Sequence, residues 1–353
     1  MLDDTTKYEI FRNRDETYSG QFYMGVRSTG IFCRPGCPAR TPKAENCLFF
    51  QNAEGALKAG YRPCKRCHPM NMPGEASALI KKLINLVESD PERRWSEKDL
   101  LANGVDPSTA RRQFKSRFGM TFSAYVRQCN LAKARQCLAQ GDSVIEAQLC
   151  AGFDSPSGFR VAFAKTFGQS PKDVKISPLL IDWIDTPLGT MVTICDEQEV
   201  YLAEFTVRKN LQGQLEKLTT AYKRPILPGR NDITMLVETQ IKSYFHGSLK
   251  SFDLPIKTTG TDFQNGVWQA LCDIPYGQTR SYAQLATAIG NDKAFRAVAS
   301  SNARNGLAII IPCHRVINKG GALGGYAGGL DKKRWLLDHE ARVSKSSNRA
   351  AAP

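Results

Sequence analysis

The pattern of hydrophobic and polar positions separates helical from strand-forming parts of the chain. Apolar residues between Leu79 and Val87 recur at the spacing of one helix face, and no strand-like alternation follows before Ile181. From there to Phe205 apolar and polar positions alternate, and TPLG and DEQE interrupt the alternation as turns. From Thr261 the pattern becomes helical again, over TDFQNGVWQALCDI, SYAQLATAIG and KAFRAVASSNA. The pattern therefore predicts a helical middle part followed by a C-terminal part of the α+β class.

Two stretches that contain Pro or Gly interrupt the periodic segments, and they mark the expected domain boundaries. They are NMPGEAS at 71–77 and KISPLL at 175–180. The change from alternation to helical periodicity at Thr261 divides the last part once more. We therefore predict a multidomain α+β protein with domains at 1–75, 76–175, 176–260 and 261–342, followed by a polar tail at 343–353.

The helical middle part contains an internal repeat. DPSTARRQFKSRFG at 106–119 and SPSGFRVAFAKTFG at 155–168 carry Pro, Ser, Arg, Phe, Phe and Gly in the same order. Each copy has Asp or Ser at the N-cap, Pro at the first helical position and Gly at the end, which predicts a helix with defined limits. A shorter segment ending in Gly precedes each copy, so the pattern predicts helix, turn, helix twice.

Two interpretations of this repeat remain open: a bundle of duplicated hairpins, and a pair of units that place helices in successive major grooves of DNA. Basic side chains that we expect to be exposed favour the second interpretation. In the first copy they are Arg111, Arg112, Lys115 and Arg117, and in the second copy Arg160 and Lys165.

Composition makes a polyanion the first partner to consider. Lys and Arg number 48 against 34 Asp and Glu, a formal net charge of +14. The alternative is a soluble basic protein with no nucleic-acid role. No stretch approaches the roughly 20 apolar residues of a membrane span, and MLDDTTKYEI lacks the features of a secretory signal, so we expect a cytoplasmic protein. In that compartment the 11 Cys favour metal binding or thiol chemistry over disulfides.

Four of the cysteines form two close pairs, Cys33 with Cys37 and Cys64 with Cys67. Four thiolates on tight loops suit a tetrahedral Zn²⁺ ion, and chance clustering is the alternative. His68 is a competing ligand, although its position next to Cys67 favours a bystander. Basic residues surround the cluster as though a phosphate backbone approached it. They are Arg34, Arg40, Lys43, Arg62, Lys65 and Arg66.

A second reactive motif lies in IIIPCHRVI, where Cys313 and His314 follow an apolar run. One interpretation is the end of a strand that carries polar residues by chance. The other is a nucleophile beside its base, presented by a buried sheet. Adjacency in the sequence does not ensure that a ring nitrogen faces the sulfur, so the motif alone leaves both open.

Three parts of the chain resemble known families. FYMGVRSTGIFCRPGCPAR and ALKAGYRPCKRCHP resemble the zinc domain of the Ada proteins, bacterial DNA-alkylation repair factors, and the middle part resembles the DNA-binding domain of AraC-type regulators. Residues from about 176 to 342 resemble O6-alkylguanine-DNA alkyltransferases, through FQNGVWQAL, IPYGQTRSYAQLA, KAFRAVASSNARNGLAIIIPCHRVI, GGYAGGL and KRWLLDHE. The resemblances imply a small zinc-bound α/β domain, an all-α tandem helix-turn-helix domain, and a sheet subdomain followed by a helical, winged-helix-like methyltransferase subdomain.

The alkyltransferase resemblance implies a role for each residue of the second motif. Cys313 is the methyl acceptor, and His314 acts as its base through a bound water. Glu340 holds the imidazole in the required tautomer. Asn305 braces the turn that presents the cysteine, and Tyr282 donates a proton to the guanine ring as the carbon–oxygen bond breaks.

The same resemblance implies that SYAQLATAIGNDKAFRAVAS enters the minor groove and that the damaged nucleotide is extruded from the duplex. Arg296 then fills the gap left in the stack. Tyr326 and the Gly-rich segment around it form the lip of the pocket.

The Ada resemblance implies that Cys33 takes a methyl group from a methylphosphotriester in DNA. Methylation of one thiolate removes a negative charge near phosphates, which relieves about 1 to 4 kcal/mol of repulsion per close contact. DNA binding should therefore tighten, and the repair domain would act as a sensor for the helix-turn-helix domain.

We therefore predict a single-turnover methyltransferase that repairs both lesions and, once methylated, activates transcription of alkylation-response genes. Its expected partners are alkylated and promoter double-stranded DNA and RNA polymerase, and we expect a monomer. One alternative is a DNA-binding regulator in which only the zinc-site acceptor is active. Another is a Cys–His hydrolase with a zinc module attached.

Overall fold

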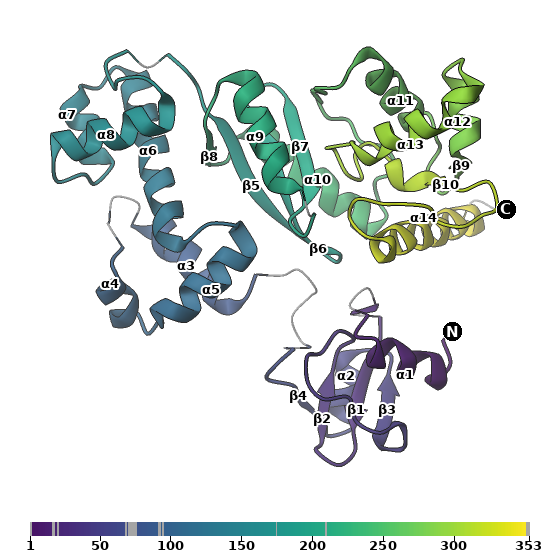
Figure 1. The fold of residues 1–353 in the computed structure, drawn as a ribbon. Helices are drawn as coiled ribbons and strands as arrows, with labels where there is room; N and C mark the ends of the chain where they lie inside the picture. The colour runs from purple at the N-terminus through teal and green to yellow at the C-terminus, as the bar shows by residue number, and fades with distance from the viewer. Residues whose placement is uncertain are drawn as a thin grey trace.

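The computed structural model describes residues 2–15, 18–19, 21–67, 69, 76–90, 93, 95–173, 175–208 and 210–350. His68 and most of the expected linker at 71–77 lie outside these residues. Helices and small sheets alternate along the chain (Figure 1), so the prediction of a multidomain protein of mixed helix and sheet is confirmed. Within the described residues, no helix has both the length and the apolar character needed to cross a membrane.

The N-terminal part is a small sheet with two helices. The strands are β1 (Tyr23–Val26), β2 (Ile31–Cys33), β3 (Cys47–Phe50) and β4 (Arg62–Pro63), and the helices are α1 (Asp4–Arg12) and α2 (Ala53–Lys58). The strand order is β3-β1-β2-β4, in which only β2 and β4 run parallel. The rings of Phe11, Phe22 and Phe49 pack against one another in T-shaped and tilted arrangements, in the same core cluster as the four cysteines. The sheet therefore places Cys33 at the end of β2 and Cys64 directly after β4.

The middle part is all helical, and two helix pairs flank one long helix (Figure 1). The helices are α3 (Ala78–Ser89), α4 (Glu97–Ala102), α5 (Pro107–Phe118), α6 (Phe122–Gln140), α7 (Val144–Cys150) and α8 (Pro156–Phe167). Asp106 and Ser155 cap α5 and α8 by accepting backbone N–H bonds, as the repeat predicts. Gly119 and Gly168 end these helices in the left-handed conformation, at φ of 72° and 67°. The repeat thus forms two helix-turn-helix units on the common axis of α6.

The repeated phenylalanines form the cores of the two units. The rings of Phe114 and Phe118 lie 4.3 Å apart between centroids, and those of Phe163 and Phe167 also lie 4.3 Å apart. All four side chains are buried. Because residues four apart share a helix face, the same spacing produces the same packing in both copies.

The C-terminal part begins with a four-stranded sheet of order β7-β6-β5-β8. Its strands are β5 (Leu179–Thr186), β6 (Gly189–Cys195), β7 (Val200–Phe205) and β8 (Ile226–Pro228). The first three are antiparallel, as the alternation predicts, and β8 joins parallel to β5. Two helices that the sequence pattern did not indicate complete this subdomain: α9 (Leu211–Tyr222) and α10 (Asp232–His246).

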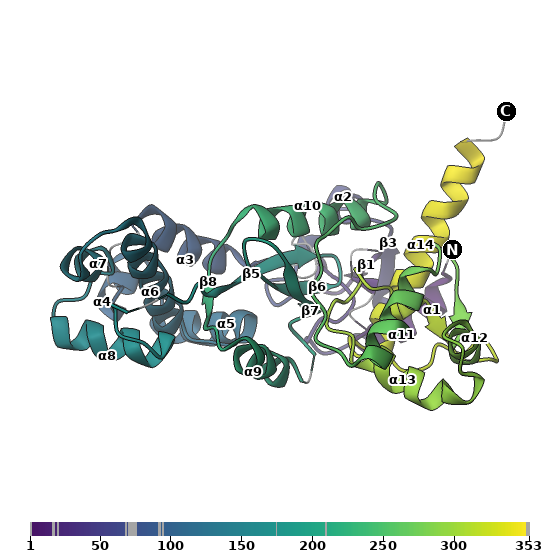
Figure 2. The same cartoon turned by 90° about the horizontal axis from the view of Figure 1, so that it is seen from above.

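A helical subdomain follows, and a two-stranded parallel bridge joins two of its segments. Its elements are α11 (Asp262–Cys272), β9 (Arg280–Ser281), α12 (Tyr282–Ala288), α13 (Phe295–Ala303), the short 3-10 helix η4 (Cys313–Arg315), β10 (Val316–Ile317) and α14 (Leu330–Ala350). Helix α14 continues through most of the segment expected as a polar tail, and its C-terminal end projects from the molecule (Figure 2).

The apolar run before Cys313 does not form a regular strand. Ile309 has a left-handed backbone, with φ of 72°, and Ile311 N–H donates to the Leu307 carbonyl at 2.8 Å. The start of this segment pairs with the edge of the neighbouring sheet, since Ala308 N–H donates to the Ala203 carbonyl at 2.7 Å. The run is therefore a buried turn that joins the two subdomains, and the regular strand that both of our interpretations assumed before Cys313 does not form.

The first helix-turn-helix unit contacts the C-terminal sheet, and this contact corrects one expectation. Arg117, expected to be exposed, has a side chain only 13% exposed and forms an ion pair with Asp185 of β5. Its guanidinium also donates to Thr190 Oγ1 at 2.8 Å. Beside this pair Trp183 packs against Phe118 with ring centroids 4.7 Å apart. Arg117 thus joins two domains, because its place at the C-terminal end of α5 faces the sheet.

Candidate metal centre and active site

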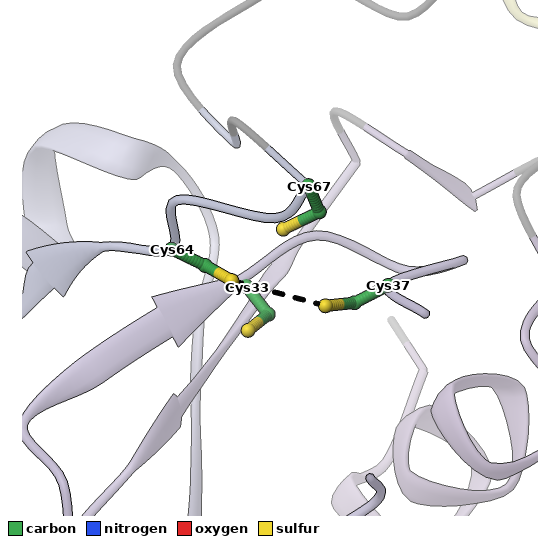
Figure 3. A group of neighbouring side chains, drawn as sticks. All are labelled: Cys33, Cys37, Cys64 and Cys67. Carbon is green, nitrogen blue, oxygen red and sulfur yellow. Dashed lines mark hydrogen bonds between the residues drawn. The ribbon is translucent and has the colours of Figure 1, made fainter. Parts of the chain in front are cut away.

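Four cysteine side chains converge at one end of the N-terminal sheet (Figure 3). Cys33 ends β2, Cys37 lies in the loop that follows, and Cys64 and Cys67 lie in the turn after β4. All four sulfur atoms lie within 4.8 Å of one another. The four side chains are buried, each at most 8% exposed. Two loops therefore bring together a donor set that resembles the corners of one tetrahedron.

The chemistry of this donor set fits a zinc ion. Hydrogen bonds that the Cys33 thiol donates to Cys37 and Cys67, together with burial, raise the pKa of Cys33 when no cation is nearby. Several buried sulfurs can be thiolates together only if a cation compensates their charge. Soft thiolates in a closed group of four select Zn²⁺. The cluster is a zinc-binding site, held by Cys33, Cys37, Cys64 and Cys67.

A groove of about 720 Å³ opens over the sulfurs. Cys33, Cys37 and Cys64 form part of its wall, and the basic residues on its rim are Arg40, Arg62, Lys65 and Arg66. These four side chains are exposed, whereas Arg34 is half-buried in the loop between Cys33 and Cys37. Lys43 is exposed in the segment that precedes β3. The groove therefore offers positive charge beside a buried sulfur, which suits an approaching phosphate.

The second site is built around Cys313, in the short helix η4. Its side chain is 6% exposed, and its sulfur accepts a hydrogen bond from Asn305 Nδ2 at 3.1 Å. Asn305 also donates to the Ile311 carbonyl at 2.9 Å and accepts from Leu307 N–H at 2.9 Å. Asn305 therefore lies at the centre of the turn that carries Cys313.

His314 is fully buried, and its two nitrogens have different surroundings. Nε2 lies 2.8 Å from Glu340 Oε1, whereas Nδ1 has no hydrogen-bond partner among the described residues. Burial lowers the pKa of His314, although the contact with Glu340 opposes this shift. A neutral ring that donates from Nε2 to Glu340 keeps a free lone pair on Nδ1. The ring is thereby prepared to accept a proton.

The thiol of Cys313 needs such a base. Burial raises its pKa to about 11, and the hydrogen bond from Asn305 only partly opposes that rise. A thiol with this pKa contains little thiolate at neutral pH, and the thiolate is the nucleophile. The Nδ1 of the adjacent His314, which has no hydrogen-bond partner among the described residues, is a candidate acceptor for the thiol proton.

Glu340 is the centre of a buried network that orients His314. It accepts from Tyr244 Oη at 2.8 Å, Gly277 N–H at 2.9 Å and Arg315 Nε at 3.0 Å. Burial alone would raise the pKa of Glu340, but the bonds with His314 and Arg315 lower it to about 2. The carboxylate is therefore charged and fixed. The sequence reasoning missed Tyr244 and Arg315, although Arg315 belongs to the segment IIIPCHRVI quoted above.

The two tyrosines expected at the pocket lie close to Cys313. Tyr282 begins α12 and is half-buried, and burial together with the Cys313 thiolate raises its pKa. Tyr326 is half-buried as a residue, but its hydroxyl is buried without a partner among the described residues. The Gly-rich segment lies against both rings, since a Cβ at Gly324 would lie 3.3 Å from Tyr282 Oη and a Cβ at Gly328 would lie 2.8 Å from Tyr326 Cε1. Arg296, in contrast, is exposed on α13, with its guanidinium 5.8 Å from the Phe295 ring centre.

The sequence reasoning also missed Lys333, the first residue of the quoted KRWLLDHE. Its side chain is fully buried, and Nζ donates to the Val316 carbonyl at 2.5 Å and the Gly325 carbonyl at 3.3 Å. Burial lowers the pKa of Lys333 to about 8. The lysine ties the Gly-rich segment to the strand that follows Cys313.

The remaining basic residues that we expected to bind DNA lie on the surfaces of α5 and α8. Those exposed are Arg111, Arg112, Lys115, Arg160 and Lys165. Arg111 pairs with Glu97 at 2.9 Å, with both side chains more than half exposed. An ion pair of this kind contributes little stability and can be exchanged for a phosphate.

A closed thiolate centre, paired helix-turn-helix units and a buried Cys–His–Glu arrangement together define a multidomain DNA-binding protein with a reactive cysteine. Family models match all three parts: "Metal binding domain of Ada" over residues 6–70, "Helix-turn-helix domain" over 101–175, and "6-O-methylguanine DNA methyltransferase, DNA binding domain" over 262–342.

Two curated relatives match almost the whole chain. The bifunctional transcriptional activator/DNA repair enzyme Ada of Escherichia coli (strain K12) is 36% identical, over 96% of this chain and 97% of its own. The regulatory protein Ada of Salmonella typhimurium is 35% identical, over 97% and 98%. The chain belongs to the Ada family. A crystal structure of the O6-methylguanine methyltransferase of Mycobacterium tuberculosis is 36% identical and covers 46% of this chain and 93% of its own, with a TM-score of 0.40.

Proposed function

We propose that this protein repairs alkylated DNA by irreversible methyl transfer and, once methylated, activates alkylation-response genes. The methyl groups would come from O6-methylguanine to Cys313 and from methylphosphotriesters to Cys33. One observation carries this proposal: a buried Cys313 sulfur held by Asn305, next to a neutral His314 that Glu340 orients. The arrangement is that of an activated nucleophile with a base and an orienting third group.

The reaction at Cys313 needs the damaged guanine outside the duplex, because its O6-methyl carbon is otherwise enclosed in the base stack. His314 Nδ1 takes the thiol proton through a water. The thiolate attacks the methyl carbon, so that a sulfur–carbon bond forms as the bond between that carbon and O6 breaks. Tyr282 donates a proton to the guanine ring, and this neutralises the charge that the leaving oxygen delivers to the base.

The groups around the pocket support this course. The Gly-rich segment lies against Tyr282 at Gly324 and against Tyr326 at Gly328, and together they would form the lip of the base pocket. Arg296 is exposed on α13, free to enter the duplex where the nucleotide leaves. We propose that α12 and α13 together form the winged-helix-like unit that binds the minor groove.

The product of this transfer is a thioether, which water does not cleave under mild conditions. Each acceptor cysteine therefore reacts once. The protein is an enzyme by mechanism and a stoichiometric reagent by kinetics, a methylated-DNA–protein-cysteine S-methyltransferase.

At the first site Cys33 would accept a methyl group from a methylated phosphate. Bound zinc would keep the cysteine sulfurs in the thiolate form at neutral pH. Arg62 and Lys65 on the exposed rim of the groove, with the half-buried Arg34 beside them, would hold the neighbouring unmodified phosphates. Methylation of Cys33 removes a negative charge from the cluster, and the attraction between DNA and this face increases.

Through the middle domain, the increased attraction to DNA that follows methylation of Cys33 would act at promoter DNA. Arg111, Arg112 and Lys115 on α5 and Arg160 on α8 would contact two successive major grooves, which their exposure supports. RNA polymerase is the proposed partner at the promoter, and we propose that the protein acts there as a monomer.

Intact-protein and peptide mass spectrometry after incubation with methylated DNA tests the proposal. We expect two methyl increments, one on the Cys33 peptide and one on the Cys313 peptide, each lost only in the matching Cys→Ala variant. An increment at Cys33 alone would favour a regulator with one active acceptor. No increment in a zinc-loaded protein would refute the repair function, and turnover of acyl esters would then support a Cys–His hydrolase.

A further inference from the structure

A pair of thiols lies in the second helix-turn-helix unit, away from both sites above. Cys137 is in the last turn of α6, and Cys150 is the last residue of α7. Their sulfur atoms lie 2.9 Å apart, closer than two unbonded sulfurs normally approach, and the residues are 13 apart in the sequence. Both side chains are half-buried, so small solutes can reach them.

We propose that Cys137 and Cys150 are a redox-active pair that a low-molecular-weight disulfide, such as oxidised glutathione, converts reversibly to a disulfide. The geometry already satisfies the hardest requirement of that reaction, since the two sulfurs need to move by less than 1 Å to reach the ~2.05 Å of an S–S bond. The two helices that carry them are joined by the short turn at 141–143 and pack along each other.

The exchange runs through two substitutions at sulfur. Cys137 donates its S–H to the Cys150 sulfur, and burial together with this contact raises the pKa of Cys137 to about 12. Cys150 therefore attacks first, forming a mixed disulfide and releasing one glutathione thiol. Cys137 then gives up its proton and attacks the Cys150 sulfur, which releases the second glutathione. Two protein thiols and one small disulfide become one protein disulfide and two small thiols.

The bond would hold α7 against the end of α6. The core of this unit contains Ala134 of α6, Ala147 of α7 and Phe163 of α8, so the position of α7 also sets the position of α8. Closing the 13-residue separation restricts the unfolded chain more than the folded one. Oxidation should therefore slow local opening of the second unit without altering the first unit or the methyl-accepting cysteines.

Peptide mass spectrometry under non-reducing conditions tests the proposal. Trypsin cleaves after Arg135 and Arg160 and at no residue between, so both thiols fall in one peptide, 136–160. The full-length, zinc-loaded protein is treated with oxidised glutathione, its remaining thiols are alkylated, and the peptides are weighed. We expect peptide 136–160 to lose two hydrogen atoms and to carry no alkyl group. The exposed Cys272, in peptide 258–280, is the internal control and should carry glutathione.

The variants Cys137→Ser and Cys150→Ser should each convert the remaining cysteine to a glutathione adduct. In the wild type, amide hydrogen exchange across α7 should slow by about 10-fold or more on oxidation, and a reducing agent should reverse this. Peptide 136–160 alkylated at both thiols while Cys272 carries glutathione would overturn the proposal. Separate glutathione adducts at both cysteines would overturn it as well.

Discussion

Replacing Asn305 by Ala tests how the structure holds its nucleophile. The side chain joins four backbone or sulfur groups of one turn: Leu307 N–H, the Ile311 carbonyl, the Cys313 sulfur and, at 3.4 Å, the Leu307 carbonyl. Asn305 is 3% exposed, so water cannot replace the lost contacts. The substitution should therefore cost both stability and reactivity.

The size of each loss follows from the contacts. The buried Leu307 N–H loses its partner, which costs about 1–3 kcal/mol, whereas the Ile311 carbonyl still accepts from Cys313 N–H at 2.8 Å, so we expect about 2 kcal/mol of destabilisation. That is a large share of the ~5–15 kcal/mol available to a typical domain. The thiolate also loses a charge-assisted donor of about 1.5–3 kcal/mol, which corresponds to roughly 10- to 100-fold in rate.

Chemical denaturation measures the first loss, and the rate of methyl uptake at Cys313 measures the second. Asn302→Ala is the matched control for stability, because its amide donates a longer bond, 3.3 Å, to the Cys313 carbonyl and its other contact is with Tyr282 rather than with the turn. Asn305→Asp separates the two effects. It keeps an acceptor for Leu307 N–H but places negative charge beside the sulfur, so it should slow methyl uptake more than it destabilises the fold.

Two results would refute this reasoning. One is an Asn305→Ala protein whose unfolding free energy stays within about 1 kcal/mol of the wild type. The other is an Asn305→Asp protein that takes up methyl groups at the wild-type rate.

Three further predictions concern other parts of the molecule. Methyl uptake at Cys313 should fall as the pH drops through the pKa of His314. The midpoint should lie below the ordinary value of 6.5, because burial disfavours the charged ring. A midpoint above that value would contradict a neutral His314 base. Chelation of zinc should abolish uptake at Cys33 and leave Cys313 reactive, as peptide mass spectrometry can show. Trp183→Ala should remove the contact with Phe118 and destabilise the helical domain by about 3 kcal/mol in calorimetry, whereas an unchanged transition would exclude that contact in solution.

The residues of the Cys313 site could be predicted from the sequence only in part. The sequence predicted Cys313 with its neighbour His314, and the resemblance to alkyltransferases added Glu340 and Asn305. The structure brings all four together, although Glu340 lies 26 residues from His314 in the chain. It also adds Tyr244, 96 residues from Glu340, which no pattern in the sequence connects with the site.

Features that depend on a few neighbouring residues were determined by the sequence alone. The caps at Asp106 and Ser155, the glycines that end α5 and α8, and the strands separated by TPLG and DEQE all arise from local hydrogen bonds and backbone preferences. The spacing of the four zinc-site cysteines is local in the same sense, since each pair lies on one tight turn.

Only the tertiary structure decided the features that depend on distant surfaces. The apolar run before Cys313 became a buried turn because it packs against the edge of β7 instead of extending the sheet. Arg117 became an interdomain contact because α5 ends at β5, and Cys137 met Cys150 because α6 and α7 pack together. Periodicity tells which face of an element is buried but not which surface covers it, and that choice depends on the packing of the whole chain.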